Sequence, residues 1–238
     1  MSTPRISTSI LLRAGWLMAA ATFCHAEPAK LAPIMMVPGE ALASDTFADS
    51  LPKAWRPGKG TWTVKDGVVS GTEIPADKHD AVMRRALNFT NAIITFSFRL
   101  DRARQITLSI NDAKEHVCRL LINPRGFTVQ KDDHDHDGPD KAVIFARVAM
   151  TLAPAEWHTA VVELNGTEMV AQVDSAGKVG FGADELLNRP KANFGLTVAG
   201  GPAEFRDIRI VNATPRTDWA QVKQALGTRS AQVAPTRR

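Results

Sequence analysis

Residues 60–71 (GTWTVKDGVVSG) have the pattern of a β-hairpin. Trp62 and Val64 fall on one face of an extended segment, because side chains alternate between the two faces of a strand. Asp66 and Gly67 then supply the turn, since glycine tolerates the positive φ that a tight hairpin requires. The same short alternation, bounded by turn residues, recurs through the rest of the chain and favours an all-β fold.

Further segments with strand character follow one another at short intervals. The clearest covers residues 91–100, where Ile94, Phe96 and Phe98 alternate with more polar side chains, as in a half-buried strand. Other strands are expected at residues 44–50, 81–85, 105–111, 116–122, 126–131, 142–150, 157–164, 168–174, 193–199 and 204–211. Short strands separated by turn residues in this way predict a two-sheet antiparallel jelly-roll sandwich.

The first 26 residues have the composition of a secretory signal peptide. Arg5 and Arg13 give a positive start, and the apolar run at 14–23 is too short to span a bilayer. Residues 24–26 (CHA) then offer a cleavage point. An uncleaved membrane anchor is the alternative. We expect an exported protein, secreted or periplasmic, with no membrane attachment after cleavage.

The rest of the chain is expected to divide into three parts. Residues 27–43 are a linker or an edge segment, residues 44–212 form the sandwich domain, and residues 213–238 carry a short helix and a disordered tail. The helix is expected at 217–226, because Thr217 is a candidate N-cap and Gly227 is a stop signal.

Charge and cysteine content restrict the possible partners. Of the 238 residues 44% are hydrophobic, and the formal net charge is +4. Basic and acidic residues are interspersed without a basic stripe, so we expect no nucleic-acid partner. After cleavage Cys118 has no second cysteine to pair with, because the other one is Cys24. Cys118 is therefore expected to be a small buried residue of a strand.

Four stretches together resemble a known family. They are residues 60–68 (GTWTVKDGV), 88–99 (NFTNAIITFSFR), 156–163 (EWHTAVVE) and 204–210 (EFRDIRI). They resemble the 3-keto-disaccharide hydrolase domain family, whose secreted members share the concanavalin-A-like lectin and glucanase (LamG-like) sandwich. The resemblance frames residues 47–211 and implies a sandwich that usually meets carbohydrate. Its motifs are those of strands and turns, so it is more specific for fold than for activity.

The sequence departs from that family where its enzymes carry their signature. Enzyme-like members have an Asn-Ser-Gly stretch ending in Arg on the strand after the Phe-x-Phe run, whereas residues 104–110 here read RQITLSI. The Glu-x-Asp-x-x-Glu strand of the wider fold's glucanases is also missing from the sequence. No active-site residue can therefore be transferred from the resemblance.

Residues 131–140 (KDDHDHDGPD) are a polar cluster with the D-x-D-x-D-G spacing of calcium loops. Alternate carboxylates can converge on one hard cation, which makes calcium the possible cofactor. The three carboxylates with this spacing are Asp133, Asp135 and Asp137. Ile144 occupies the twelfth position, where calcium loops have glutamate. The alternatives are a hydrated hairpin loop without metal, or a softer metal shared with His134 and His136.

Saccharide sites use aromatic faces for stacking and planar polar side chains for hydroxyl groups. Trp55 lies in an expected loop flanked by proline and glycine residues and is the best stacking candidate, with packing in the core as the alternative. Arg119 and Lys131 are the polar candidates for binding a saccharide. They fall in or beside neighbouring strands, so they are candidates for one polar face.

Three residues are the candidates for acid–base catalysis. His79 and His116 fall close to the same predicted strands, and Asp132 supplies a carboxylate beside them. The alternative is that both histidines are surface residues without a shared geometry. The sequence contains no nucleophile elbow, phosphate loop or metalloprotease helix.

Three classes of function remain open. We place first a secreted carbohydrate-binding sandwich that takes an oligosaccharide or polysaccharide, because the fold signature is kept while the enzyme motif is missing. The second is a glycoside (3-keto-disaccharide) hydrolase or lyase, which predicts a cluster of histidines and carboxylates on one face. The third is a structural interaction domain of an envelope, which predicts a featureless face.

Overall fold

The computed structural model describes residues 31–135, 137–138, 141–174 and 177–233, so the predicted signal peptide lies outside the described residues. In chain order the elements are β1 (Met36–Asp45), β2 (Trp55–Lys59), β3 (Thr61–Lys65), β4 (Val68–Thr72), η1 (Pro75–Asp77), β5 (Ala81–Phe89), β6 (Ala92–Arg99), β7 (Ala103–Asn111), β8 (His116–Asn123), β9 (Gly126–Lys131), β10 (Val143–Ala149), β11 (His158–Asn165), β12 (Glu168–Val173), β13 (Val179–Ala183), η2 (Glu185–Leu187), β14 (Lys191–Gly200), β15 (Ala203–Pro215) and α1 (Trp219–Val233).

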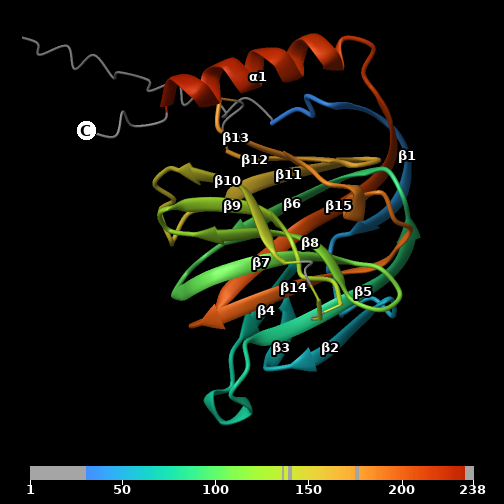
Figure 1. Cartoon of the computed structure of the whole chain (residues 1–238). Coiled ribbons are helices and arrows are strands. Elements are labelled where there is room, and N and C mark those ends of the chain that lie inside the picture. Colours follow the sequence, from blue (N-terminus) through green and yellow to red (C-terminus); the bar gives the residue numbers. More distant parts are fainter. Residues whose placement is uncertain (1–30, 136, 139–140, 175–176, 234–238) are drawn as a thin grey trace, which may run out of the picture. The chain divides into compact units, whose positions relative to one another are not determined.

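The strands form two antiparallel sheets that pack face to face (Figure 1). The first sheet has the order β13-β12-β11-β6-β15-β4-β3, and β1 pairs with β15. The second sheet has the order β10-β9-β8-β7-β14-β5-β2. Most neighbours in the sheets are not neighbours in sequence, as in a jelly roll. The predicted all-β sandwich with a C-terminal helix is confirmed.

The hairpin expected at residues 60–71 is formed by β3 and β4. Thr61 pairs with Thr72 and Lys65 with Val68, so the register runs without a bulge. The turn residues have φ values of 51° at Asp66 and 79° at Gly67, both in the left-handed region. A two-residue hairpin turn with positive φ at both positions matches the right-handed twist of the strands, which explains the Asp-Gly sequence.

Some element boundaries differ from the sequence prediction. β2 occupies residues expected to form a loop, and it tolerates Pro57 because it is the edge strand of its sheet. β13 was also not predicted. The prediction that α1 stops at Gly227 is wrong, because the helix continues to Val233; a glycine weakens a helix without having to end it. Among the described residues, no helix is long and apolar enough to cross a membrane.

The main core fills the space between the sheets. Ile94, Phe96 and Phe98 of β6 all point into it, as their alternation predicts. Cys118 is also buried there as a free cysteine, which confirms its expected packing role. Burial raises the pKa of the Cys118 thiol to about 12, so the thiol stays protonated near neutral pH.

A second apolar cluster covers the outer face of the first sheet. Val161, Val170 and Ile93 pack there against the segment before β1 and against Trp219 of α1. Glu163 lies on the same face and is fully buried. Its carboxylate accepts the backbone N–H groups of Ile34, Met35 and Met36 at 2.8, 2.9 and 2.7 Å. The chain itself therefore covers this part of the outer face of the first sheet.

Candidate functional site

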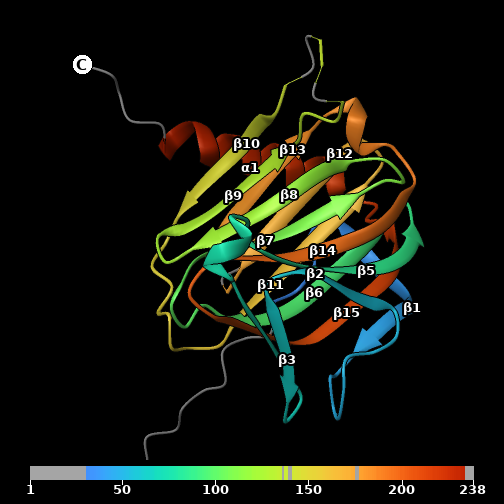
Figure 2. The ribbon, with the colours of Figure 1, turned by 90° about the horizontal axis from the view of Figure 1, so that it is seen from below.

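The outer face of the second sheet carries a groove of about 220 Å³. Side chains from β5, β7, β8 and β14 line it, together with the loop between η1 and β5. In Figure 2 these strands run side by side, with the η1 loop in front of them. Asp77 anchors this loop, because its carboxylate accepts the N–H of Gly60 at 3.2 Å.

The floor of the groove is polar although it is almost inaccessible. Thr107 and Ser109 of β7 are only 7% and 5% exposed, yet they alternate with core residues and so point away from the core. Neighbouring strands and the loops above them reduce their exposure. Thr197 of β14 is paired with Thr107 and extends the row of hydroxyl groups. The floor therefore offers hydrogen-bond donors and acceptors whose side chains are held in place by the surrounding structure.

Gly195 leaves an opening in the middle of this floor. It is paired with Ser109 on one side and with Arg84 on the other. A Cβ at this position would lie 3.2 Å from the carbonyl oxygen of Met83 and 3.3 Å from Cγ of Arg84. The stem of Arg84 therefore packs against the glycine, which places the guanidinium on the groove side of the sheet.

His116 stands at one end of the groove in a defined orientation. The oxygen of the Asn111 side chain accepts a hydrogen bond from its Nδ1 at 2.5 Å. Asn111 in turn donates to Oδ1 of Asn193 at 2.6 Å. Nε2 is then the ring nitrogen left for a ligand. Burial lowers the pKa of His116, and the charges of Arg119 and Arg84 lower it further, against the opposing effect of Asp132 and Glu115.

Arg119 lines the groove beside His116, and the buried carboxylate of Asp132 holds it in place. The Nε of Arg119 lies 2.8 Å from Oδ2 of Asp132. The N–H is not aligned for a hydrogen bond, so the contact is an ion pair. Asp132 is only 6% exposed and also accepts the amide of Gln130 at 3.2 Å. This carboxylate therefore positions Arg119 and is not itself open to the groove.

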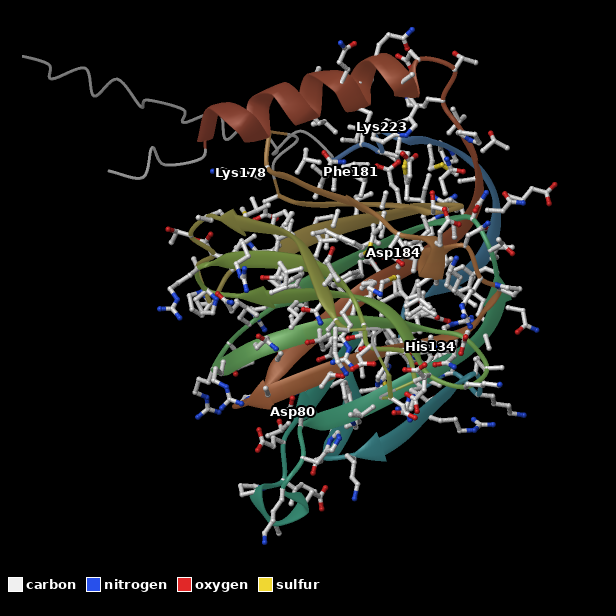
Figure 3. The ribbon with its side chains drawn as sticks, viewed as in Figure 1. Asp80, His134, Lys178, Phe181, Asp184 and Lys223 are labelled. Atoms are coloured by element: carbon white, nitrogen blue, oxygen red, sulfur yellow. The ribbon has the colours of Figure 1, made fainter. Side chains whose placement is uncertain are left out.

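Asp112 ties the loop after β9 to the edge of this site. Its carboxylate accepts the backbone N–H groups of Lys114 and Glu115 and lies 2.7 Å from Nε2 of His134. Burial acts to raise the pKa of Asp112, but these hydrogen bonds outweigh it and lower the pKa to about 2. Figure 3 shows His134 apart from Asp80 of the η1 loop. This contact therefore holds the loop after β9 against the connection between β7 and β8.

The structure brings together three of the residues proposed from the sequence. His79, His116 and Arg119 all line the groove, and Asp132 contacts Arg119. His79 is the least constrained of them, since it is exposed and its Nδ1 bonds only the carbonyl oxygen of Asp80. These residues therefore lie around one groove, while their roles in catalysis or binding stay predictions.

Trp55 and Lys131 do not reach the groove. Trp55 is 2% exposed and its Nε1 donates to Oδ2 of Asp45 at 3.0 Å, so its ring is a core element and cannot stack on a saccharide. Lys131 is 6% exposed and its Nζ lies 3.8 Å from Oδ2 of Asp184. It points inward because it is paired with buried Cys118 and alternates with Gln130 on the outer face.

The sequence interpretation missed several groove residues. They are Arg84, Gln105, Thr107, Ser109, Gly195 and Thr197. One signal was available, because residues 105–111 (QITLSIN) alternate polar and apolar side chains as regularly as residues 91–100 do. Only the pairing of β7 with β8 and β14 shows that these polar positions share a face.

The predicted calcium loop finds no support in the described residues. Among them, no group of three or more His, Cys, Asp or Glu side chains is arranged to hold a metal ion. Oδ1 of Asp135 accepts the N–H of Asp137, and Asp137 accepts the N–H of Gly138, so these side chains serve their own turn. Asp133 lies 3.7 Å from Lys141. His136 and Asp140 lie outside the described residues.

Comparison with solved structures defines the class of fold. The carbohydrate-binding module CBM66 from Bacillus subtilis superimposes with a TM-score of 0.54 at 14% identity, over 67% of this chain and 96% of the module. The laminarinase from Rhodothermus marinus gives 0.54 at 12% identity, over 75% and 99%. LamA from Zobellia galactanivorans, solved with laminaritriose and laminaritetraose, gives 0.55 at 12% identity, over 74% and 100%.

The chain therefore has the jelly-roll sandwich fold that carbohydrate-binding modules and laminarinases share. This agrees with the concanavalin-A-like sandwich implied by the sequence resemblance. No protein-family model matches the sequence, and no curated protein matches it either. Membership of the 3-keto-disaccharide hydrolase family stays a prediction.

Proposed function

We propose that this chain is an exported carbohydrate-binding protein that holds an oligosaccharide in the groove of the second sheet. The observation that carries the proposal is the pre-formed polar floor of the groove. Thr107, Ser109 and Thr197 present hydroxyl groups there, and Gln105 and Arg119 add planar polar side chains at its sides. Hydroxyl groups and planar amides or guanidiniums are what saccharide hydroxyls require as partners.

Recognition in this groove would rely on hydrogen bonds, since no Phe, Tyr or Trp ring is among the described residues that line it. The fold supports the proposal because two of its structural neighbours are named for carbohydrate binding or for laminarin cleavage. A structural envelope domain is less favoured, because that alternative predicted a featureless face.

A glycoside-cleaving activity is the second candidate, as a 3-keto-disaccharide hydrolase or lyase. One observation favours it: His116 is held by Asn111 and its lowered pKa keeps the ring neutral, as a general base requires. Hydrolysis by paired carboxylates has less support, because among the described residues Asp80 is the one acidic residue that lines the groove and Asp132 is buried under Arg119.

Proton NMR of mixed oligosaccharides, both neutral and acidic and including 3-keto sugars, tests the proposal on the mature chain. We expect saccharide signals to broaden without new signals. The broadening should be lost in Thr197→Phe, which fills the groove, and kept in Thr95→Phe, a matched change on the outer face of the first sheet.

Other outcomes decide between the classes. New saccharide signals that grow with time would replace binding alone by an enzyme, and loss of turnover in His116→Gln would then identify the base. Spectra that stay unchanged with every oligosaccharide would exclude both saccharide functions.

A further inference from the structure

Two neighbouring rows of residues cross the second sheet at right angles to its strands, and both are basic. The first row is Arg56, Arg84, Gly195, Ser109, Arg119, Gln130 and Ile144. The second row is Lys59, Val82, Thr197, Thr107, Leu121, Thr128 and Arg147. Together they hold four arginines and one lysine, and neither contains an acidic residue.

These rows lie on the outer face and pass through the groove. Eight of the residues that line the groove belong to them. Neighbouring strands are ~4.8 Å apart, so a row that crosses all seven strands is about 29 Å long. An extended ligand lying across the strands would therefore meet several positive charges, with the groove at the centre of its path.

Of the two arginines that line the groove, Arg84 is the more available to such a ligand. It is exposed, and it has no ion-pair partner among the residues that the structure describes. Arg119, in contrast, forms an ion pair with Asp132. Arg85, which follows Arg84 in the sequence, points into the protein and forms an ion pair with Asp45. The remaining carboxylate at the groove belongs to Asp80 on the η1 loop.

The floor between the two arginines is shaped to admit a ligand. Arg84 and Arg119 are separated by three strand spacings, or roughly 14 Å between backbones. Gly195 and Ser109 lie between them; Gly195 adds no side chain and Ser109 only a short one, so the stem of Arg84 can lie along this part of the floor. A sugar ring placed there would contact the hydroxyl floor, while an acidic substituent would reach a guanidinium.

We propose that the groove selects an anionic saccharide, carrying carboxylate or sulfate groups, and that Arg84 binds its anionic group. The inference rests on the proposed saccharide-binding function and names its ligand class. A guanidinium forms paired, charge-assisted hydrogen bonds with carboxylate or sulfate oxygens, which a neutral hydroxyl cannot match. Arg119, already paired with Asp132, serves as a donor to the sugar.

Calorimetric titration of the mature chain with three trisaccharides tests this inference. The probes are trigalacturonate, a sulfated galactotriose and neutral galactotriose, so they differ in the acidic group. We expect at least one anionic probe to bind about tenfold more tightly than the neutral one, or better. Its advantage should shrink with added salt, because screening weakens charge pairs. The stronger of the two anionic probes identifies the group that is recognised.

Variants distinguish a specific contact of Arg84 with the anionic group from a general effect of positive charge on the surface. Arg84→Gln should remove most of the advantage of the anionic probe, and Arg84→Lys should retain part of it. Arg209→Gln is the matched control, because Arg209 is an exposed strand residue of the first sheet. It should leave all three affinities unchanged.

Two results would overturn the inference in distinguishable ways. If neutral galactotriose binds as tightly as the anionic probes, or if Arg84→Gln changes all three equally, selection of an anionic saccharide is excluded while saccharide binding stands. If none of the probes binds and the oligosaccharide mixture is also ignored, the proposed function fails together with this inference.

Discussion

Nδ1 of His116 lies 2.5 Å from the side-chain oxygen of Asn111, and this contact sets the orientation of the imidazole in the groove. Because an amide oxygen only accepts, Nδ1 carries the proton and Nε2 is left as an acceptor. Burial and the nearby guanidiniums keep this ring neutral by lowering its pKa. The groove therefore combines a neutral imidazole with cationic side chains.

The first prediction concerns the titration of His116. Replacing Arg84 by Gln removes one of the charges that lower its pKa, so we expect the pKa to rise toward 6.5. Proton–nitrogen NMR of the imidazole across pH measures it, with Arg209→Gln as control. A lowered pKa in the folded state means that His116 adds stability above pH 6.5, which is lost as the pH falls through the lowered value. An identical titration in Arg84→Gln would contradict this electrostatic account.

A second prediction separates the core role of Trp55 from a role in binding. Trp55→Phe removes the hydrogen bond to Asp45 and leaves a small void, so the free energy of unfolding should fall by ~2 kcal/mol. Asp45 keeps its ion pair with Arg85 at 2.6 Å, so the fold should persist. Urea unfolding measures the loss, and saccharide affinity should not change. A large loss of affinity in a folded variant would restore the stacking role.

The third prediction concerns Glu163 and the segment before β1. In Glu163→Gln an amide nitrogen replaces one of the oxygens that accept the N–H groups of Ile34, Met35 and Met36. At least one buried donor then loses its acceptor, so we expect destabilisation of ~2 kcal/mol. Thermal unfolding compares it with Glu156→Gln, an exposed control. Faster hydrogen exchange at Met35 and Met36 should accompany the loss, and unchanged exchange would argue against this anchoring.

The fourth prediction is a pH dependence at His158. Its Nδ1 lies 2.5 Å from Oδ2 of Asp174, and its Nε2 lies 2.8 Å from the carbonyl oxygen of Ala153. Both partners are hydrogen-bond acceptors, so both contacts are hydrogen bonds only when the imidazole carries a proton on each nitrogen. Burial would lower the pKa of His158, but these interactions outweigh it and raise the pKa.

A raised pKa in the folded state stabilises the protein fully below pH 6.5, and this stability is lost as the pH rises through the raised value. The free energy of unfolding of His158→Gln should therefore fall furthest behind the unchanged chain at acidic pH. Chemical unfolding at several pH values measures the difference. A gap that widens toward alkaline pH would contradict the assignment.

The strand pattern of this chain could be predicted because it depends on neighbours in sequence. The alternation at 91–100 identified β6, and Asp66-Gly67 identified the β3–β4 turn. β2 was missed because its residues read as a loop, and only pairing with β5 makes it a strand. α1 extends past Gly227 because a single glycine is a weak stop.

The candidate site was predicted only in part, because it depends on strand pairing. His116 and Arg119 are three residues apart on β8, so a regular strand would place them on opposite faces. Both line the groove because the register shifts at the start of the strand. Such a bulge leaves no clear trace in the sequence. The inward direction of Lys131 was also not apparent, since a lysine followed by the polar residues 132–137 is typical of a surface position.

By itself the sequence determined that this chain forms short alternating strands joined by turns, because alternation and turn chemistry are local properties. It did not determine which strands are neighbours in the sheets, and this pairing of strands decides which residues form the site. Arg84, Gly195, Ser109 and Arg119 come from four strands and form one row only through pairing across long stretches of chain. Pairing between distant strands depends on how the whole core packs, so the groove and its charges exist only in the tertiary structure.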